Sequence, residues 1–521
     1  MNRDSYRAVN QLLMRAVRRA EKATPDHLAR TFVPIEPLLT LLDSLDNHVI
    51  YGRRGTGKTH LLKYLGEVKK REGDLALYID LRLVGSSGGL YADASQPLAL
   101  RATHLLVDVV EAVHEGLYEL LLNTEVFDDA LDVIVRSLDE IAEAATQVRV
   151  VGSTENTVVL DAGSENDSQG ELGLTLAKTG PSVTARASNR RKQTKRVTRT
   201  RKQSGSEVLT VKFGPLGRAL SSLVRGLGGS HLWLLLDEWS NVPRELQPFL
   251  ADLLKRTFFP IEGVSVKIGA LERQSYFRLN SGRGNDYLGI DLGADTAASL
   301  DLDDFLVFRS DRSHAARFFS QLLYQHVAVL MSEMGHELSI ETADRFRETI
   351  FMGQAFDELV RASEGVPRDA LNIVGLAAAI ATDKAITSTN IDVGARDYFL
   401  RDKEGKISRK ADKVLNDLVE VCVTKGRREV ALKRYGESDS RVIQELYDNR
   451  LLHRIRQGVI LDNDYSTKFD LYLVDFGCFV DLLSRGEVQT VNDGTDILQV
   501  ALSSRIRLNS GSVAMLPPGR S

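Results

Sequence analysis

The chain has 521 residues, of which 43% are hydrophobic and 26% charged, and its formal net charge at pH 7 is −4. This length predicts roughly two to four domains. The near-neutral overall charge predicts neither nucleic-acid nor membrane binding, so either would need a local patch, and without a run of about 18 apolar residues we expect no membrane-spanning helix.

Residues 1 to 24 have the pattern of an amphipathic N-terminal helix and lack the apolar core of a signal peptide. The two cysteines, Cys422 and Cys478, are isolated and stand among apolar residues. Because they match no zinc-ligand spacing, we expect buried free thiols rather than a disulfide. Free thiols suit a reducing compartment, and we therefore expect a cytoplasmic protein.

Residues 52 to 59 form a complete G-x4-G-K-[ST] phosphate loop. A short β-rich run precedes it at residues 48 to 51, and residues 61 to 65 follow with helical spacing. A strand, a glycine-rich turn and a helix in this order direct backbone N–H groups and a helix N-terminus at nucleotide phosphates. We expect Lys58 to reach the β- and γ-phosphates and Thr59 to coordinate Mg²⁺. The expected nucleotide-binding residues of this segment are Gly52, Arg53, Arg54, Gly55, Thr56, Gly57, Lys58, Thr59 and His60.

A second strand is predicted at residues 75 to 80. Helical patterns follow at residues 95 to 122 and 127 to 146. Residues 147 to 213 are then rich in Ser, Thr, Gly and Asn, with short alternating runs that predict a β-hairpin with a flexible tip.

The middle of this stretch is strongly basic, since nine of the 17 residues from 186 to 202 are Lys or Arg and none is acidic. Such a run can neutralise several phosphates with sequence-independent, salt-dependent affinity, and without aromatic residues it does not favour stacking on single-stranded bases. We expect double-stranded DNA as its partner, with an acidic protein or a solvated loop of no specific role as the alternatives. The candidate nucleic-acid contacts are Arg186, Arg190, Arg191, Lys192, Lys195, Arg196, Arg199, Arg201 and Lys202.

Residues 232 to 236 are a fully apolar run that ends in Asp237 and Glu238. Such a strand fits the centre of a parallel sheet, and its carboxyl end would lie beside the phosphate loop. Asp237 would bind Mg²⁺ directly or through water, and Glu238 would act as a base or orient the attacking water, so we expect hydrolysis rather than binding alone. With a helix at residues 244 to 256 and a strand at residues 264 to 271, the alternation predicts an α/β fold with a doubly wound parallel sheet.

With these motifs the chain resembles the AAA+ ATPases, a class of P-loop NTPases, and within them the initiator-like clade related to origin-recognition ATPases. Residues 365 to 368, Gly-Val-Pro-Arg, open a helix and look like the sensor-2 motif of that family. The resemblance implies that Arg368 reaches the γ-phosphate from a helical lid at residues 311 to 390, and that Phe32 and Val33 contact the adenine. The expected cofactors are then ATP and Mg²⁺, and the expected catalytic residues are Glu238, Lys58 and Arg368.

Two features of the family pattern have no clear counterpart. The sensor-1 position is usually a small polar residue, but Glu272, Arg273 and Gln274 follow the strand at residues 264 to 271, and none of them is assigned. Arginine fingers reach a neighbouring subunit's site, and the candidates for that role, each with a plain solvated arginine as the alternative, are Arg278 and Arg283.

The resemblance also implies the domain boundaries. Residues 25 to 310 would form the AAA+ nucleotide-binding domain, with an insertion at residues 85 to 229 that carries the basic tip. A winged-helix domain would follow at residues 395 to 485, and residues 486 to 521 are expected to form an irregular tail.

The predicted winged helix has helical patterns at residues 406 to 425 and 440 to 450. Two strands follow around a polar turn, at residues 452 to 460 and 469 to 476. In DNA-bound winged helices the last helix enters the major groove. Here that helix carries Glu445 and Asp448 as well as two arginines, so DNA binding and protein interaction both remain open for this domain.

The leading interpretation is an ATP-binding and ATP-hydrolysing AAA+ switch that acts on or beside DNA and loads, remodels or licenses a partner. Replication initiation, transposition and antiviral defence are roles of this type. We expect a homo-oligomer and a protein partner that carries any effector activity. The main alternative is a nucleotide-gated signalling scaffold that senses a protein and assembles without DNA contact, and the basic tip discriminates between the two. A third interpretation is an inactive nucleotide-binding structural subunit, which substitution of Glu238 tests.

Overall fold

The computed structural model describes residues 2–84, 93–122, 130–145, 147–161, 172–175, 196–280, 287–297, 299–306, 312–424, 428–433, 437–460, 468–484 and 513–514. By its internal contacts the chain divides into two units. We call Met1–Val84 with Gly228–Ser521 the core unit, and Gly85–Leu227 the insertion unit.

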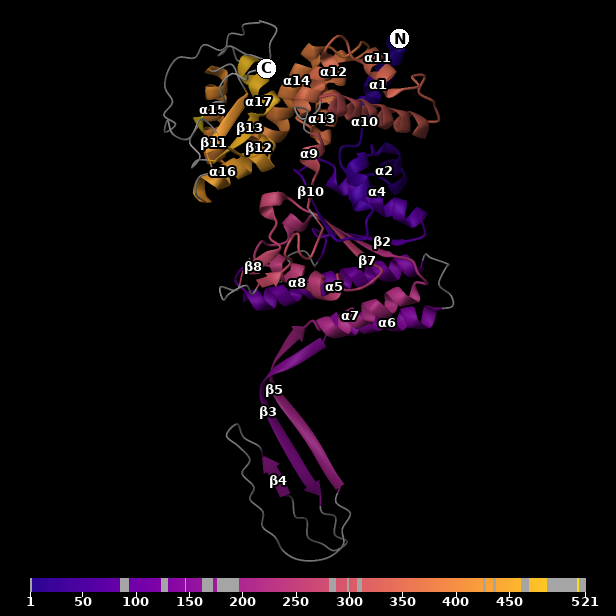
Figure 1. Ribbon diagram of the computed structural model, residues 1–521, viewed down its shortest axis with the longest axis vertical. Helices are drawn as coiled ribbons and strands as arrows, with labels where there is room; N and C mark the ends of the chain where they lie inside the picture. Colours follow the sequence, from indigo (N-terminus) through magenta and orange to yellow (C-terminus); the bar gives the residue numbers. More distant parts are fainter. Residues whose placement is uncertain are drawn as a thin grey trace, which may run out of the picture. The chain divides into compact units, whose positions relative to one another are not determined.

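The core unit is built on a five-stranded parallel sheet with the strand order β10-β1-β7-β6-β2. All six residues of β6 are buried, as expected for a parallel strand whose two faces are covered. Asp80 of β2 pairs with Asp237 of β6, so the carboxyl ends of the two strands lie side by side. This sheet confirms the predicted α/β class. The strands are β1 (His48–Tyr51), β2 (Leu75–Asp80), β6 (Leu232–Asp237), β7 (Val264–Gly269) and β10 (Leu300–Asp301) (Figure 1).

Helix α4 (Lys58–Arg71) packs on this sheet through one apolar face. Its Leu61, Leu62 and Leu65 share a buried cluster with Trp233 and Leu235 of β6, which fixes the start of the helix at the carboxyl edge of the sheet. Around the sheet lie α2 (Pro25–Thr31), α3 (Glu36–Leu42), α8 (Gln247–Thr257), α9 (Leu302–Leu306), the short turns η1 (Ala20–Lys22), η3 (Trp239–Asn241) and η4 (Glu272–Gln274), and the ribbon of β8 (Arg278–Asn280) and β9 (Tyr287–Gly289).

A helical domain covers the segment predicted to be the lid. It comprises α10 (Arg312–Glu333), α11 (Ala343–Ile350), α12 (Ala355–Ser363), α13 (Pro367–Ala381) and α14 (Ser388–Tyr398). The N-terminal helix α1 (Arg3–Arg15) joins it, because Val9, Leu12 and Leu13 are buried in the same apolar cluster as Leu371 and Val374 of α13. The amphipathic face read from the sequence is therefore the face that packs on the helical domain.

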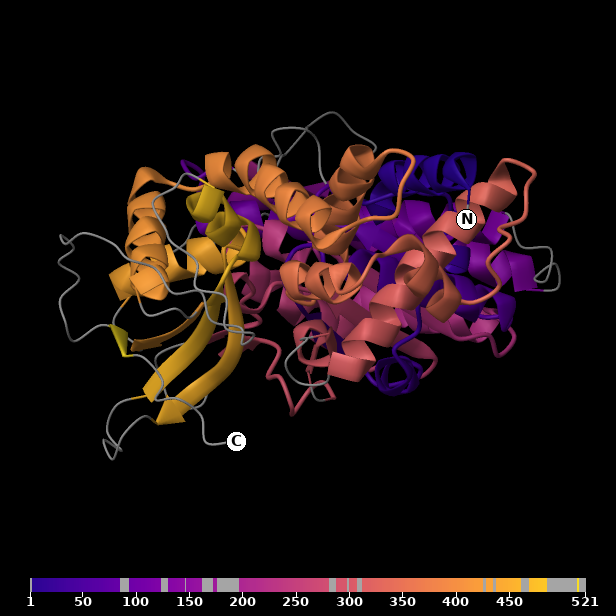
Figure 2. The ribbon, with the colours of Figure 1, turned by 90° about the horizontal axis from the view of Figure 1, so that it is seen from above.

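The C-terminal domain follows through the π-helical turn η5 (Phe399–Lys403) and η6 (Glu404–Lys406). Its elements are α15 (Arg409–Thr424), β11 (Glu429–Lys433), α16 (Glu437–Asp448), β12 (Leu452–Ile460), β13 (Lys468–Val474), α17 (Phe476–Ser484) and β14 (Val513–Ala514). The sheet is antiparallel with the order β12-β13-β11-β14. In Figure 2 this domain lies directly beside the helical domain, where α17 packs on α14.

Three details of the C-terminal domain bear on the sequence expectations. Cys422 and Cys478 are buried free thiols, as predicted, within one apolar cluster. Phe476 begins α17 instead of ending a strand. Val513 and Ala514, in the segment expected to be irregular, form the edge strand β14 and pair with Leu432 and Ala431 of β11. The winged-helix assignment stays a prediction.

In its described residues the insertion unit has the helices α5 (Leu98–Leu122), α6 (Leu131–Ala145) and α7 (Phe213–Gly226). Its strands there are β3 (Gln147–Asp161), β4 (Leu172–Thr175) and β5 (Arg196–Thr210). β3 and β5 pair antiparallel along their whole length, from Gln147 with Thr210 to Asp161 with Arg196 (Figure 1). In both units, none of the helices within the described ranges combines the length and apolarity needed to cross a membrane.

Candidate nucleotide site

The phosphate loop connects β1 to α4 at the carboxyl edge of the sheet. Gly55 and Gly57 have φ values of +91° and +102°, in the left-handed region that glycine enters without strain. The Lys58 ammonium donates hydrogen bonds to the carbonyls of Gly52 (2.7 Å) and Arg53 (3.0 Å). Burial lowers the pKa of Lys58. The lysine is thus held inside the loop, where phosphate oxygens could replace the carbonyls as acceptors.

Two oxygen donors suited to Mg²⁺ meet beside the loop. The Thr59 hydroxyl donates to Asp237 Oδ2 at 2.6 Å, and the Tyr78 hydroxyl donates to the same oxygen at 3.0 Å. Asp237 is only 1% exposed. Within the described part of the chain no group of three or more His, Cys, Asp or Glu side chains could hold a metal. The Thr59 hydroxyl and the Asp237 carboxylate, which lie side by side, fit an ion whose remaining ligands come from phosphate and water, as is usual for Mg²⁺.

Glu238 follows Asp237 at the end of β6 in a strained conformation, with a φ of +59°, which is uncommon outside glycine. Its Oε2 accepts a hydrogen bond of 2.7 Å from the Asn241 amide, and its Oε1 lies 3.6 Å from Arg82 Nη1. Burial, and then the charge of Asp237, raises the pKa of Glu238. Sequence reasoning missed Arg82 and Asn241, although each follows a strand that ends in Asp.

A cavity of about 350 Å³ joins these groups to the helical domain. Side chains of η1, α2, α4 and α10 form another part of its wall, among them His27, Leu28, His60, Leu322 and His326. This wall combines leucines with imidazole rings and could receive a flat heteroaromatic base.

Phe32 and Val33 do not line this cavity. The Phe32 ring stacks on Tyr64 with centroids 4.0 Å apart and meets His60 edge-on at 5.2 Å. Val33 is buried in the cluster of the helical domain. Phe32 thus contacts His60, which lines the cavity, without lining the cavity itself.

Arg368 enters the cavity from the start of α13. Pro367 occupies the first turn of that helix, where its missing N–H and fixed φ are favourable. The Arg368 backbone N–H donates to the carbonyl of Gly55 at 3.2 Å, and its Nε donates to the carbonyl of Arg18 at 3.3 Å. The helix start therefore rests on the phosphate loop, and the guanidinium lines the cavity.

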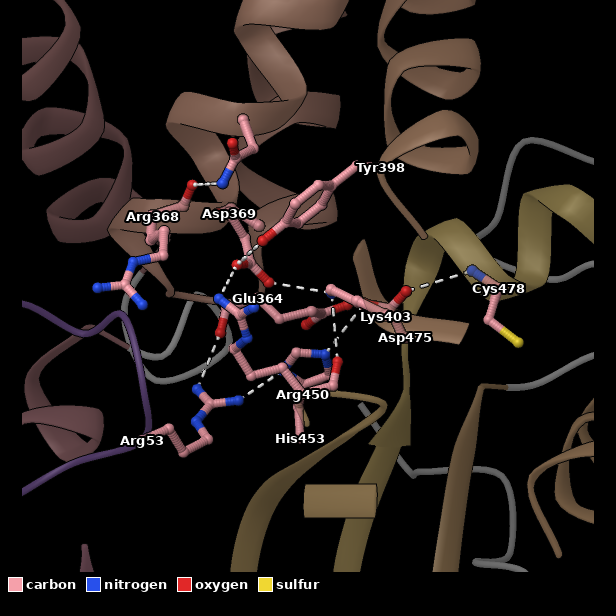
Figure 3. Close-up of polar contacts among 12 residues, drawn as sticks. Arg53, Glu364, Arg368, Asp369, Tyr398, Lys403, Arg450, His453, Asp475 and Cys478 are labelled. Atoms are coloured by element: carbon pink, nitrogen blue, oxygen red, sulfur yellow. Dashed lines mark hydrogen bonds and ion pairs between the residues drawn. The ribbon is translucent and has the colours of Figure 1, made fainter. Parts of the chain in front are cut away.

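The remaining residues of the loop take different directions. Thr56 is buried, and its hydroxyl donates to the Arg53 carbonyl at 2.9 Å. Arg54 is exposed and lines the cavity. Arg53 is buried and points away from the cavity, into a cluster of charged side chains between the loop, the helical domain and the C-terminal domain (Figure 3).

The three residues of η4 all contact the C-terminal domain. Glu272 pairs with Arg454 at 2.8 Å, Arg273 pairs with Asp470 at 3.3 Å, and Gln274 donates to Asp448. Of the finger candidates, Arg278 pairs with Asp291 at 2.5 Å and lies over the Tyr287 ring, while Arg283 lies outside the described residues.

The basic tip is described in part. Residues 186 to 195, with Arg186, Arg190, Arg191, Lys192 and Lys195, lie outside the described residues. The backbone of Arg196, Arg199, Arg201 and Lys202 belongs to β5, paired with residues 155 to 161 of β3.

Comparisons with known proteins give one family match. A family model described as ORC-CDC6-like matches residues 16–324, more than half of the chain, including the phosphate loop and the Asp237–Glu238 pair. No curated protein matches the sequence. Among solved structures, ORC1 of Aeropyrum pernix in complex with DNA is similar over 91% of this chain and 96% of that chain, with 14% identity and a TM-score of 0.29.

Proposed function

The chain belongs to the ORC-CDC6-like family, and on that premise we propose that it is an AAA+ ATPase that binds ATP with Mg²⁺ and acts as a switch on or beside DNA. One observation carries the proposal. The phosphate loop, Glu238 and Arg368, which come from three distant parts of the chain, line one cavity. Such a convergence of a phosphate cradle, an acid and an arginine is what nucleotide hydrolysis needs.

In the bound state the loop N–H groups and Lys58 would hold the β- and γ-phosphates. Thr59 and Asp237, whose oxygens lie 2.6 Å apart, would hold Mg²⁺. The ion would neutralise phosphate charge and orient the terminal phosphate. The adenine would occupy the wall formed by Leu28, Leu322 and the imidazoles, with Phe32 supporting it through His60.

Glu238 would accept a proton from, or orient, the water that attacks the γ-phosphorus. Its raised pKa makes it a better proton acceptor than an exposed glutamate. As the new P–O bond forms, the bond to the β-phosphate oxygen breaks and ADP and inorganic phosphate result. Arg368 would stabilise the charge that develops on the γ-phosphate oxygens.

The role on DNA rests on the family and on the basic tip. We propose that the helical domain acts as a lid that reads the γ-phosphate, that residues 186 to 202 bind double-stranded DNA, and that the C-terminal domain is a winged helix. We further propose that the protein acts in the cytoplasm as a homo-oligomer, and that it loads, remodels or licenses a protein partner. The alternative, a signalling scaffold without DNA contact, shares the same nucleotide site and would lack the DNA response.

The test is phosphate release by the wild type and by Glu238→Gln at saturating ATP. We expect Glu238→Gln to lose about 100-fold or more of the rate while its ADP affinity stays within about threefold. Glu36→Gln, at an exposed acid on α3, is the matched control and should retain the wild-type rate. An unchanged rate in Glu238→Gln would remove Glu238 from the mechanism. Rates measured with and without duplex DNA at two salt concentrations separate the switch from the scaffold.

A further inference from the structure

The C-terminal domain reaches the nucleotide site through a cluster of buried charged side chains (Figure 3). We call it the buried charge cluster. It comprises four cationic and four anionic side chains with one histidine, namely Arg53, Lys403, Arg428, Arg450, Asp303, Glu364, Asp369, Asp475 and His453. With the histidine neutral, the formal charges balance, which is the condition under which charges tolerate burial.

Asp369 is the centre of this cluster and is 0% exposed. Its Oδ1 accepts hydrogen bonds from Arg450 Nη1 at 2.5 Å and from the Tyr398 hydroxyl at 3.0 Å, and its Oδ2 lies 3.0 Å from Lys403 Nζ. Burial alone would raise the pKa of Asp369, but Arg450 and Lys403 outweigh it and hold the pKa below its ordinary value. The carboxylate is therefore ionised and tied on two sides.

Asp369 is also the residue that follows Arg368 in the first turn of α13. The two residues share a backbone, so the position of Asp369 fixes the point from which Arg368 extends into the cavity. A displacement of this turn by about 1 Å is enough to lower a reaction rate by about 100-fold when the moved group acts on the reacting atoms.

Arg450 also lies close to the phosphate loop. It lies two residues after the end of α16 and has a φ of +60°. A non-glycine residue keeps this strained backbone conformation only when the surrounding contacts hold it there. A Cβ added at Gly55 would lie 3.1 Å from Arg450 Nη1 and 2.9 Å from Arg368 Cβ. Arg450 therefore lies where the phosphate loop and the start of α13 meet.

Lys403 extends from the π-helical turn between the helical and C-terminal domains and pairs with a carboxylate of each, Asp369 and Asp475. Its ammonium lies 2.5 Å from Asp475 Oδ1 and donates to the Arg450 carbonyl at 3.2 Å. π-Helical turns are rare in proteins, and those that occur often lie at functional sites. Lys403 thus fixes both the carboxylate that holds Arg450 and the backbone that carries it.

Arg53 gives the phosphate loop a second attachment to the same domain. Its Nη1 donates to His453 Nδ1 at 2.5 Å, so this nitrogen is the acceptor, and His453 Nε2 carries the hydrogen that faces Asp475 Oδ1 at 3.3 Å. Burial lowers the pKa of His453, in keeping with a neutral ring. Arg53 Nε donates to Asp303 at 2.9 Å.

We propose that Arg450 and Lys403 are positioning residues of the ATPase reaction, which act through Asp369 on Arg368. The inference rests on the proposed function. Its consequence is that a displacement of the C-terminal domain withdraws Arg368 from the γ-phosphate without removing any group that touches the nucleotide.

The test is a double-mutant cycle in the full-length chain. Lys403→Met keeps the length of the side chain and removes its charge, and we expect kcat to fall by about 10- to 100-fold while KM for ATP changes less than about threefold. In an Arg368→Ala background the same substitution should lower kcat by less than about threefold further, because the group through which it acts is gone.

Arg401→Gln is the matched control, since Arg401 lies in the same π-helical turn and pairs with Asp397 at the surface. It should leave kcat unchanged. If Lys403→Met does not fold, Tyr398→Phe removes a single hydrogen bond to Asp369 and should lower kcat by about three- to tenfold. The ratio of the affinities for ATPγS and ADP gives the same comparison without turnover.

Additive losses in the Arg368→Ala background, or an equal loss in Arg401→Gln, would overturn the positioning role. Normal wild-type turnover together with such a result leaves the proposed function intact. A wild-type chain that binds neither ATPγS nor ADP would overturn both.

Discussion

Asp369→Asn is the substitution that most directly measures how much the buried charge cluster contributes to stability. The asparagine keeps the volume of the side chain and can present its oxygen to Arg450 and Tyr398, which lie 2.5 and 3.0 Å from Oδ1. Its NH2 group then faces the Lys403 ammonium, which lies 3.0 Å from Oδ2 in the wild type. A salt bridge is thereby replaced by two facing donors in a site without water access.

Breaking a buried ion pair by removing one partner costs about 3–5 kcal/mol. Because one acceptor is kept, we expect the lower end, about 3 kcal/mol, which corresponds to an opening equilibrium constant about 100-fold larger. Native-state hydrogen exchange of the amides of α13 and α15 measures this locally. The matched control is Asp397→Asn, whose carboxylate pairs with Arg396 and Arg401 while 24% exposed, and we expect about 0–1 kcal/mol there. Equal exchange in the two variants would refute the reasoning.

Three further predictions concern the loop, the cavity wall and the basic tip. Gly55→Ala and Gly73→Ala both place alanine at a φ near +90°, which should lower the free energy of unfolding by about 1–2 kcal/mol each. Of the two positions, only Gly55 has neighbours within 4 Å of an added Cβ. Only Gly55→Ala should therefore weaken ADP binding, by about tenfold or more in a fluorescence titration. Burial lowers the pKa of His326 to about 3 from its ordinary 6.5; between these values the unfolded chain binds a proton that the folded chain does not, so stability falls as pH falls, by about 2 kcal/mol at pH 5. His326→Gln should therefore lose less free energy of unfolding between pH 7 and pH 5 than the wild type, and parallel losses in urea titrations would contradict this. Replacing Arg196, Arg199, Arg201 and Lys202 by Gln should reduce the slope of log affinity for duplex DNA against log salt by up to about 4, and an unchanged slope would exclude these residues from the contact.

Local sequence was sufficient where a motif occupies consecutive residues. The phosphate loop, its strand and its helix lie within about 25 residues of chain, and their pattern predicted the loop that connects β1 to α4. The apolar run of β6 likewise predicted a central strand and placed Asp237 at its end. Such features follow from backbone geometry and from the period of burial, which neighbouring residues determine together.

The base wall and the partners of Glu238 were not predicted. His27 and His326 approach the cavity from α2 and α10, which are almost 300 residues apart, and neither has a distinctive neighbour in the sequence. Asn241 and Arg82 each follow a strand, but only the adjacent register of β2 and β6 brings them to one carboxylate.

The sequence by itself determined that a phosphate loop and an acid pair exist and that they lie on an α/β sheet, because each is specified by contiguous residues. Only the tertiary structure decided what Arg53 and Arg450 do. Read locally, one is a variable position of the phosphate loop and the other a basic residue at the end of a helix. Folding removes both side chains from water, and in the interior each charge must find an opposite charge. The carboxylates and the histidine that meet this requirement come from α9, the helical domain and the C-terminal domain.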